Sequence, residues 1–172
     1  MHSKGISLLG ALCAASVLLV GCSGAGQPPL GDGGNTGSAC TPARQQGKPV
    51  TMGLFDLANH GTAPVTVRSV SLPGAHGMAM TTAFLVPMNN NGPQLGFGFA
   101  YPPVTYPFWA DRVPASGATI QPGQDLTLVF GVTRTTDANG HSNGPMIVYT
   151  SGRSSYTLRE KISLGLSRTA CF

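Results

Sequence analysis

The sequence predicts an all-β protein, and its composition and turn pattern carry that prediction. The 172 residues include 24 Gly and 14 Pro. Long helices tolerate neither residue well, because Gly costs backbone entropy and Pro lacks an N–H donor. Short runs rich in Val, Thr, Phe and Tyr are separated by turn residues, which is typical of many short strands. We therefore expect an antiparallel β-sandwich of immunoglobulin-like architecture with about seven or eight strands.

Six of the eight expected strands are followed directly by Gly, Pro or Asn. The strands expected in chain order are Val50–Ala58, Pro64–Leu72, His76–Val86, Gly96–Tyr101, Ala118–Gln121, Leu126–Val132, Pro145–Ser151 and Ser155–Ser167.

Three local features refine this prediction. The apolar alternation slips in phase near Arg68, which indicates a β-bulge there. The segment 137–144 is rich in Gly, Asn and Asp, and we expect a loop. Glu160 interrupts the apolar face of the last strand, and a bulge would turn its carboxylate outward.

The first residues have the pattern of a signal peptide. Lys4 is followed by residues 6–20, which are apolar or small throughout. That run is short for a bilayer span, which needs about 20 residues, and no basic cluster follows it. Residues 1–21 are therefore predicted to be a signal peptide.

The signal peptide ends in Leu19-Val20-Gly21-Cys22, which resembles the lipobox of bacterial lipoproteins. The resemblance implies that the Cys22 thiol is lipidated, that cleavage precedes Cys22, and that the protein is anchored to the extracytoplasmic face of the cell membrane. The chain as a whole resembles the small, uncharacterised β-sandwich lipoproteins of high-GC Gram-positive bacteria. Loss of Cys13 with the signal and lipidation of Cys22 would leave Cys40 and Cys171, which can form one disulfide.

Composition also predicts the domain boundaries. Residues 22–39 are rich in Gly, Ser and Pro and offer little to bury, so we expect a flexible tether. The folded domain is expected to span residues 40–172.

Charge and motifs argue against two function classes. The formal net charge is +4, but the cations are scattered. Binding to nucleic acid needs clustered cations, so we expect no such partner. No nucleophile or metalloprotease motif occurs, and the acidic residues are isolated, so we expect no enzyme and no required cofactor. An active site assembled from distant residues remains a third hypothesis.

His76 and Met78 are the candidate metal ligands, and copper is the alternative cofactor. Imidazole and thioether ligands suit Cu(I). The His-x-Met pair resembles that of periplasmic copper chaperones with a cupredoxin-like sandwich. The competing interpretation is that Met78 fills the core, because Met adapts to irregular gaps.

The segment 96–110 is the candidate binding surface. It is rich in aromatic residues and, from residue 101 on, is interrupted by Pro, which disfavours an ordinary central strand. Exposed aromatic side chains would bind an unknown protein or a cell-wall glycan. Core packing is the competing interpretation. The candidate residues are Phe97, Phe99, Tyr101, Tyr106, Phe108 and Trp109.

Lipidation at Cys22 is testable by one substitution. Cys22→Ala removes the thiol that would carry the lipid, so we expect the variant to remain uncleaved or to leave the membrane fraction. Membrane fractionation and intact-mass spectrometry measure both results, and Cys13→Ala serves as the control that should behave like the wild type. A Cys22→Ala protein that still partitions with membranes, with its mass altered only by the substitution, contradicts the lipobox interpretation.

Overall fold

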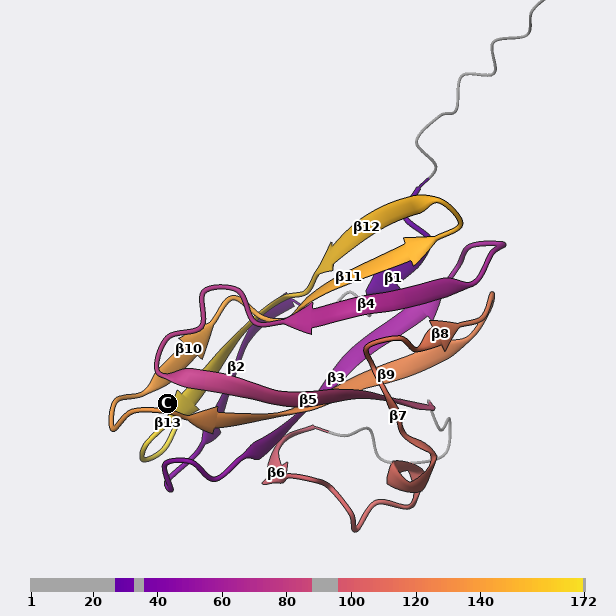
Figure 1. The fold of residues 1–172 in the computed structure, drawn as a ribbon. Coiled ribbons are helices and arrows are strands. Elements are labelled where there is room, and N and C mark those ends of the chain that lie inside the picture. The colour runs from indigo at the N-terminus through magenta and orange to yellow at the C-terminus, as the bar shows by residue number, and fades with distance from the viewer. Residues whose placement is uncertain (1–26, 33–35, 88–95, 172) are drawn as a thin grey trace, which may run out of the picture.

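A computed structural model describes residues 27–32, 36–87 and 96–171. The predicted signal peptide and Cys22 lie outside the described residues. The chain folds as an all-β sandwich, which confirms the predicted fold class, and Figure 1 shows strands packed in layers with one short 3₁₀ turn. The described residues form thirteen strands, more than expected, because several are only two or three residues long.

The larger layer is a sheet in the order β1-β3-β9-β5-β7, with β6 pairing β3 as well. Every pairing in this sheet is antiparallel. Its strands are β1 (Leu30–Asp32), β3 (Val50–Asn59), β5 (Met78–Pro87), β6 (Phe97–Ala100), β7 (Val113–Pro114) and β9 (Asp125–Arg134).

Two smaller sheets face this layer across the core. One has the order β12-β11-β4-β8 and the other β10-β13-β2. Their strands are β2 (Thr36–Pro42), β4 (Val65–Ser71), β8 (Thr119–Ile120), β10 (Gly140–Ser142), β11 (Met146–Ser151), β12 (Ser154–Arg159) and β13 (Lys161–Ser167).

The main core lies between the layers, and strand β9 contributes several fully buried side chains to it. Leu128, Phe130 and Val132 are fully buried on the inner face of β9. The Phe130 ring stacks on Phe55 of β3 with centroids 5.5 Å apart. Val129 points to the opposite face of the strand and is also fully buried. Strand β9 is therefore covered on both faces, as a central strand of a multilayer protein must be.

The predicted disulfide joins Cys40 in β2 to Cys171 near the C-terminus. It closes a loop with a sequence separation of 131 residues, and its Cα atoms lie 5.8 Å apart. An antiparallel sandwich was expected, but strands β2 and β13 pair in parallel. Strands β1 and β2 also place residues 30–32 and 36–39 in sheets, so the boundary expected at Cys40 falls inside β2.

The end of the chain differs from the single strand expected over Ser155–Ser167. The chain breaks at Glu160 into β12 and β13, which belong to different sheets. The Glu160 side chain is only 3% exposed, so the expectation that it turns outward is wrong. Gly144 permits this crossing, because a Cβ there would collide with the carbonyl oxygen of Ile162. The segment expected to be a loop over 137–144 also contains a short strand, β10.

The predicted bulge at Arg68 is confirmed. Val148 of β11 pairs with Ser69, and the next residue, Tyr149, pairs with Val67, so Arg68 is the extra residue on β4. Its side chain points to solvent and its Nε donates to Thr150 Oγ1 at 3.2 Å.

Arg134, at the end of β9, is a charged side chain buried to 2% exposure. Its guanidinium donates from Nε to the carbonyl of Ala43 at 2.8 Å and from Nη1 to that of Thr136 at 2.7 Å. A third donor, Nη2, reaches the carbonyl of Arg44 at 3.2 Å. Buried charges are tolerated when hydrogen bonds replace their hydration, so Arg134 joins the end of β9 to two loops.

Across the stretches that the structure describes, none of the helical turns has the length and apolar character required to cross a bilayer.

Candidate functional site

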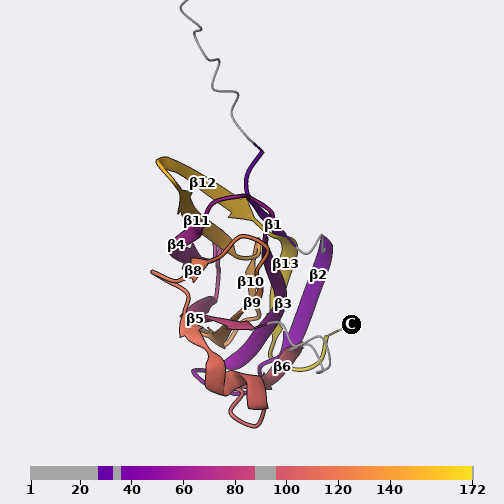
Figure 2. The same cartoon turned by 90° about the vertical axis from the view of Figure 1, so that its right-hand side faces the viewer.

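Residues 97–113 run from β6, which pairs with β3, across the outer face of the larger sheet to β7, which pairs with β5, and we call them the outer aromatic segment. The segment comprises β6, the 3₁₀ turn η1 (Pro107–Asp111) and the start of β7. Figure 2 shows β6 and η1 at the end of the molecule opposite the β11–β12 hairpin. The sequence predicts a strand over Gly96–Tyr101 and then a Pro-interrupted stretch that is no ordinary central strand, and the structure agrees, with β6 followed by η1.

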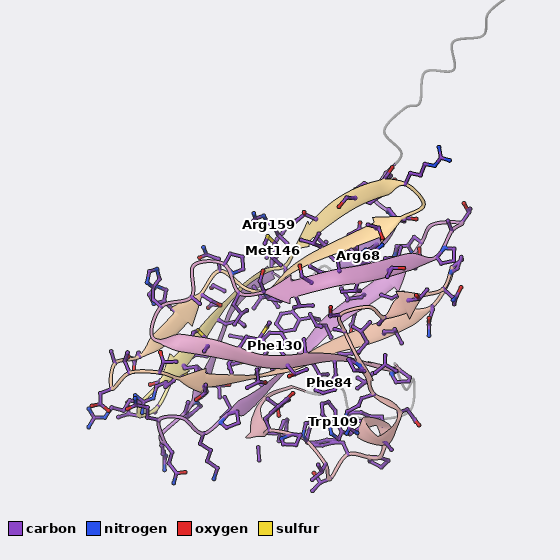
Figure 3. The ribbon with its side chains drawn as sticks, viewed as in Figure 1. Arg68, Phe84, Trp109, Phe130, Met146 and Arg159 are labelled. Carbon is purple, nitrogen blue, oxygen red and sulfur yellow. A yellow bond between two sulfur atoms is a disulfide. The ribbon has the colours of Figure 1, made fainter. Side chains whose placement is uncertain are left out.

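Trp109 anchors this segment to the sheet. The indole is 4% exposed and forms a second core with Val86 and Val129. Its ring meets that of Phe84 edge to face with centroids 5.2 Å apart, and Figure 3 shows the two side chains together beyond the sheet. The Arg112 guanidinium carbon lies 4.9 Å from the Trp109 ring centroid, a cation–π contact. Trp109 is therefore a packing residue, and its expected role as an exposed contact is wrong.

Tyr101 holds the other end of the segment through a close approach to Gly131 of β9. A Cβ at Gly131 would lie 2.7 Å from Cδ1 of the Tyr101 ring. The Tyr101 hydroxyl donates to the carbonyl of Thr82 at 2.7 Å. Only glycine lets the ring lie directly on the strand, so Tyr101 also acts in packing.

A bulge in β5 explains the surroundings of Gly131. The pairing of β5 with β9 shifts between Met80 and Ala83, which leaves Thr81 and Thr82 opposite Gly131. The Gly131 N–H donates to Thr81 Oγ1 at 3.0 Å, and that hydroxyl donates to the Gly131 carbonyl at 3.1 Å. The threonine side chain thus replaces the backbone ladder that the bulge interrupts.

Burial raises the pKa of the Tyr101 phenol above its ordinary value of 10.0. A hydrogen bond with Thr81 and the charge of Arg112 lower the pKa, but both effects are smaller than that of desolvation. Burial likewise raises the pKa of Tyr149 in the main core.

Phe97 and Phe99 were expected on one face of a strand, and the structure separates them. Gly98 between them has φ +92°, a left-handed conformation that breaks the alternation. Phe97 packs against the main core, with its centroid 6.0 Å from that of Phe55. Phe99 is 43% exposed.

The segment exposes several apolar side chains, alongside Thr105, Asp111 and Arg112. Phe99 meets Tyr106 edge to face at 5.5 Å, and Tyr106 contacts Phe108 at 5.4 Å between centroids. Tyr106 and Phe108 are half-buried. Val104 is 71% exposed and lines a shallow hollow of ≈ 320 Å³ beside Trp109. Val113 is 46% exposed.

The structure does not bring the predicted metal ligands His76 and Met78 together on an accessible face. Gly77 between them has φ +63°, so the residues are not successive same-face positions of one strand. Met78 is 5% exposed and belongs to the main core, whereas His76 is exposed. The copper hypothesis based on this pair is therefore wrong in its choice of Met78.

His76 has a different neighbour, His141 of β10. The imidazole rings stack with centroids 4.9 Å apart and planes 25° apart. Within the described residues, no three His, Cys, Asp or Glu side chains gather as a metal site would require.

Sequence reasoning missed Val104, Val113 and His141. Val104 and Val113 resemble ordinary apolar residues in sequence, and only the path of the chain leaves them in solvent. His141 lies 65 residues from His76, and no local spacing relates the two. The Pro residues around Val104 were the one available signal, because they indicated a surface loop.

Comparisons with known proteins give no family. No protein-family profile and no curated protein matches the chain. Among solved structures, the chain is similar to the ASH/PapD-like domain 7 of human CEP192, with 11% identity, 96% of each chain covered and a TM-score of 0.44. It is also similar to the VesB protease of Vibrio cholerae, with 10% identity, a TM-score of 0.41, and 81% of this chain but 32% of that one covered. Likenesses at these values carry no conclusion about activity or partners.

The contact between Tyr101 and Gly131 predicts a steric effect on stability. Gly131→Ala places a methyl group against the Tyr101 ring and the Thr81 hydroxyl, so we expect the free energy of unfolding to fall by about 1–3 kcal/mol. Urea denaturation measures the change. Gly165→Ala in β13 is the matched control, since a Cβ there meets its nearest atom at an ordinary 3.7 Å. Equal effects of the two substitutions would show that the close approach is absent.

The raised pKa of Tyr101 predicts a loss of stability at high pH. The folded state holds the phenol proton more tightly than the unfolded state, so this stabilisation is complete below the ordinary pKa of 10.0 and is lost as pH rises through the folded pKa. We expect the free energy of unfolding to decline above pH 10 and Tyr101→Phe to decline less steeply. The pKa of Tyr149 is also raised, so part of the decline in the free energy of unfolding persists in Tyr101→Phe. Parallel pH profiles for the variant and the wild type would contradict this.

Proposed function

We propose that this chain is a membrane-anchored extracytoplasmic lipoprotein that acts by binding, without catalysis, and that the outer aromatic segment is its contact surface. The partner we propose is a protein. The lipid anchor at Cys22 follows from the lipobox resemblance, and the contact surface follows from the exposure of the segment.

One observation carries the contact surface. In the described part of the chain, the exposed large hydrophobic side chains are Phe99, Val104 and Val113, and all three belong to the outer aromatic segment. Single exposed apolar residues are ordinary on protein surfaces, but their gathering in one segment marks an interaction site.

The segment is also held rigidly, which favours binding. Trp109 and Tyr101 anchor it through the second core and the contact with Gly131. A surface that is already ordered loses little conformational entropy when a partner binds. The anchors therefore support the exposed side chains without touching the partner themselves.

The position of the segment agrees with an anchored protein. Strand β1 lies near the β11–β12 hairpin, whereas β6, η1 and β7 lie toward the opposite end of the molecule (Figures 1 and 2). An anchor attached before β1 would hold the hairpin end nearer the membrane. The outer aromatic segment would then face outward, where a partner can reach it.

The chemistry of the exposed side chains favours a protein over a cell-wall glycan. Sugars stack on flat aromatic faces, but Val104 and Val113 are branched aliphatic side chains that offer no such face. Apolar side chains of a protein partner would contact both the valines and the Phe99 ring.

Site-specific photo-crosslinking in cells tests the contact surface. A photoreactive amino acid at position 104 should give a discrete crosslinked protein band, and Phe99→Ser in the same chain should reduce that band at least about tenfold, because it removes an apolar contact. The same amino acid at position 153, in the exposed β11–β12 turn at the other end, is the matched control and should give no such band.

Identical bands from positions 104 and 153 would overturn the proposal, as would a band from position 104 that Phe99→Ser leaves unchanged. Sedimentation of the protein with purified cell-wall glycan, weakened by Phe99→Ser, would replace the protein partner with a glycan.

A further inference from the structure

We propose that His76 and His141 form a second site, which binds one divalent transition-metal ion through both imidazoles and binds Cu²⁺ most tightly. The site is independent of the outer aromatic segment. It also differs from the His76–Met78 pair suggested by the sequence, because both ligands are imidazoles and they come from two different parts of the chain.

The backbone sets the two histidines directly opposite each other. The His76 N–H donates to the His141 carbonyl at 2.9 Å, and the His141 N–H donates to the His76 carbonyl at 3.0 Å. This reciprocal exchange defines an antiparallel hydrogen-bonded pair. Side chains at such paired positions project from the same face, with Cβ atoms about 5 Å apart.

The backbone next to this pair is tightly packed. Gly77, after His76, takes φ +63°, and its carbonyl accepts the N–H of Thr135 at 3.0 Å. Gly140, before His141, approaches so closely that a Cβ there would lie 2.9 Å from the Cβ of Met78. The two glycines thus let the chain segments pack tightly, and the positions of the histidine Cα atoms are fixed.

Both histidines are exposed, and their rings touch in a stack with centroids 4.9 Å apart. Rotation of the rings about their side-chain torsions can turn one nitrogen of each toward a common point above the strands. The remaining coordination positions would hold water, since the site is open to solvent.

The donor set selects the class of metal. Neutral imidazole suits Cu²⁺, Ni²⁺ and Zn²⁺, and affinity across these ions rises to a maximum at Cu²⁺. Two ligands held on a rigid pair act as a chelate, because the second imidazole binds at a high effective concentration once the first is bound. Removal of either imidazole should therefore cost nearly as much affinity as removal of both.

Titration of the full chain in detergent with Cu²⁺ tests this site, using calorimetry for affinity and electron paramagnetic resonance for nitrogen ligation. We expect one ion per chain and two coordinated nitrogens. His76→Ala and His141→Ala should each weaken binding by about 10²-fold, and the double variant should lose no more than either single variant.

His60, which is also exposed, provides the matched control. His60→Ala should bind Cu²⁺ as the wild type does. The paired backbone hydrogen bonds do not involve the side chains, so the alanine variants should fold, and His76→Asn and His141→Asn replace them if one does not. The site is refuted if the wild type binds no Cu²⁺, if binding survives His76→Ala or His141→Ala, or if His60→Ala abolishes it.

Discussion

Burial of strand β9 on both faces is the constraint on which the rest of this structure depends. Its inner face, with Leu128 and Phe130, requires the two smaller sheets as a cover. Its outer face carries Val129 and Gly131, which need a second cover that no sheet of the sandwich supplies. Exposure of this face would leave apolar area in water at roughly 25 cal/mol per Å². The outer aromatic segment provides that cover.

This constraint explains why aromatic residues that look alike in sequence have different roles. Trp109 turns toward the sheet and packs in the second core. Tyr101 also turns toward the sheet, because Gly131 has no side chain and leaves room for its ring. Phe97 turns into the main core instead, since the left-handed Gly98 breaks the alternation of side chains along β6. Phe99 and Val104 pack in neither core and are exposed to solvent. One stretch of chain thus packs on the sheet with one side and exposes apolar side chains on the other.

One end of the sandwich is held together by hydrogen bonds and a disulfide. Arg134 donates hydrogen bonds to four backbone carbonyls where β9 leaves the sheet. The disulfide joins β2 to the segment after β13, the strand with which β2 pairs in parallel. Parallel pairing brings together segments that lie far apart in sequence, so a crosslink there restricts the unfolded chain strongly. Strand β10, which contains Gly140 and His141, pairs with β13 at this same end of the molecule (Figure 1).

Local pattern by itself determined the β class, the strands around Val50, Val65 and Leu126, and the bulge at Arg68, because a single sequence displays near-neighbour alternation. The pairing of Cys40 with Cys171 was predicted from cysteine number together with the lipobox resemblance, and the structure contains that disulfide. The tertiary structure alone decided the split at Glu160, the burial of Met78 and Trp109, the exposure of Val104, and the meeting of His76 with His141. Those outcomes depend on which distant strand covers a given face. The hydrophobic effect depends on the apolar area removed from water, however far apart in sequence the contacting residues are.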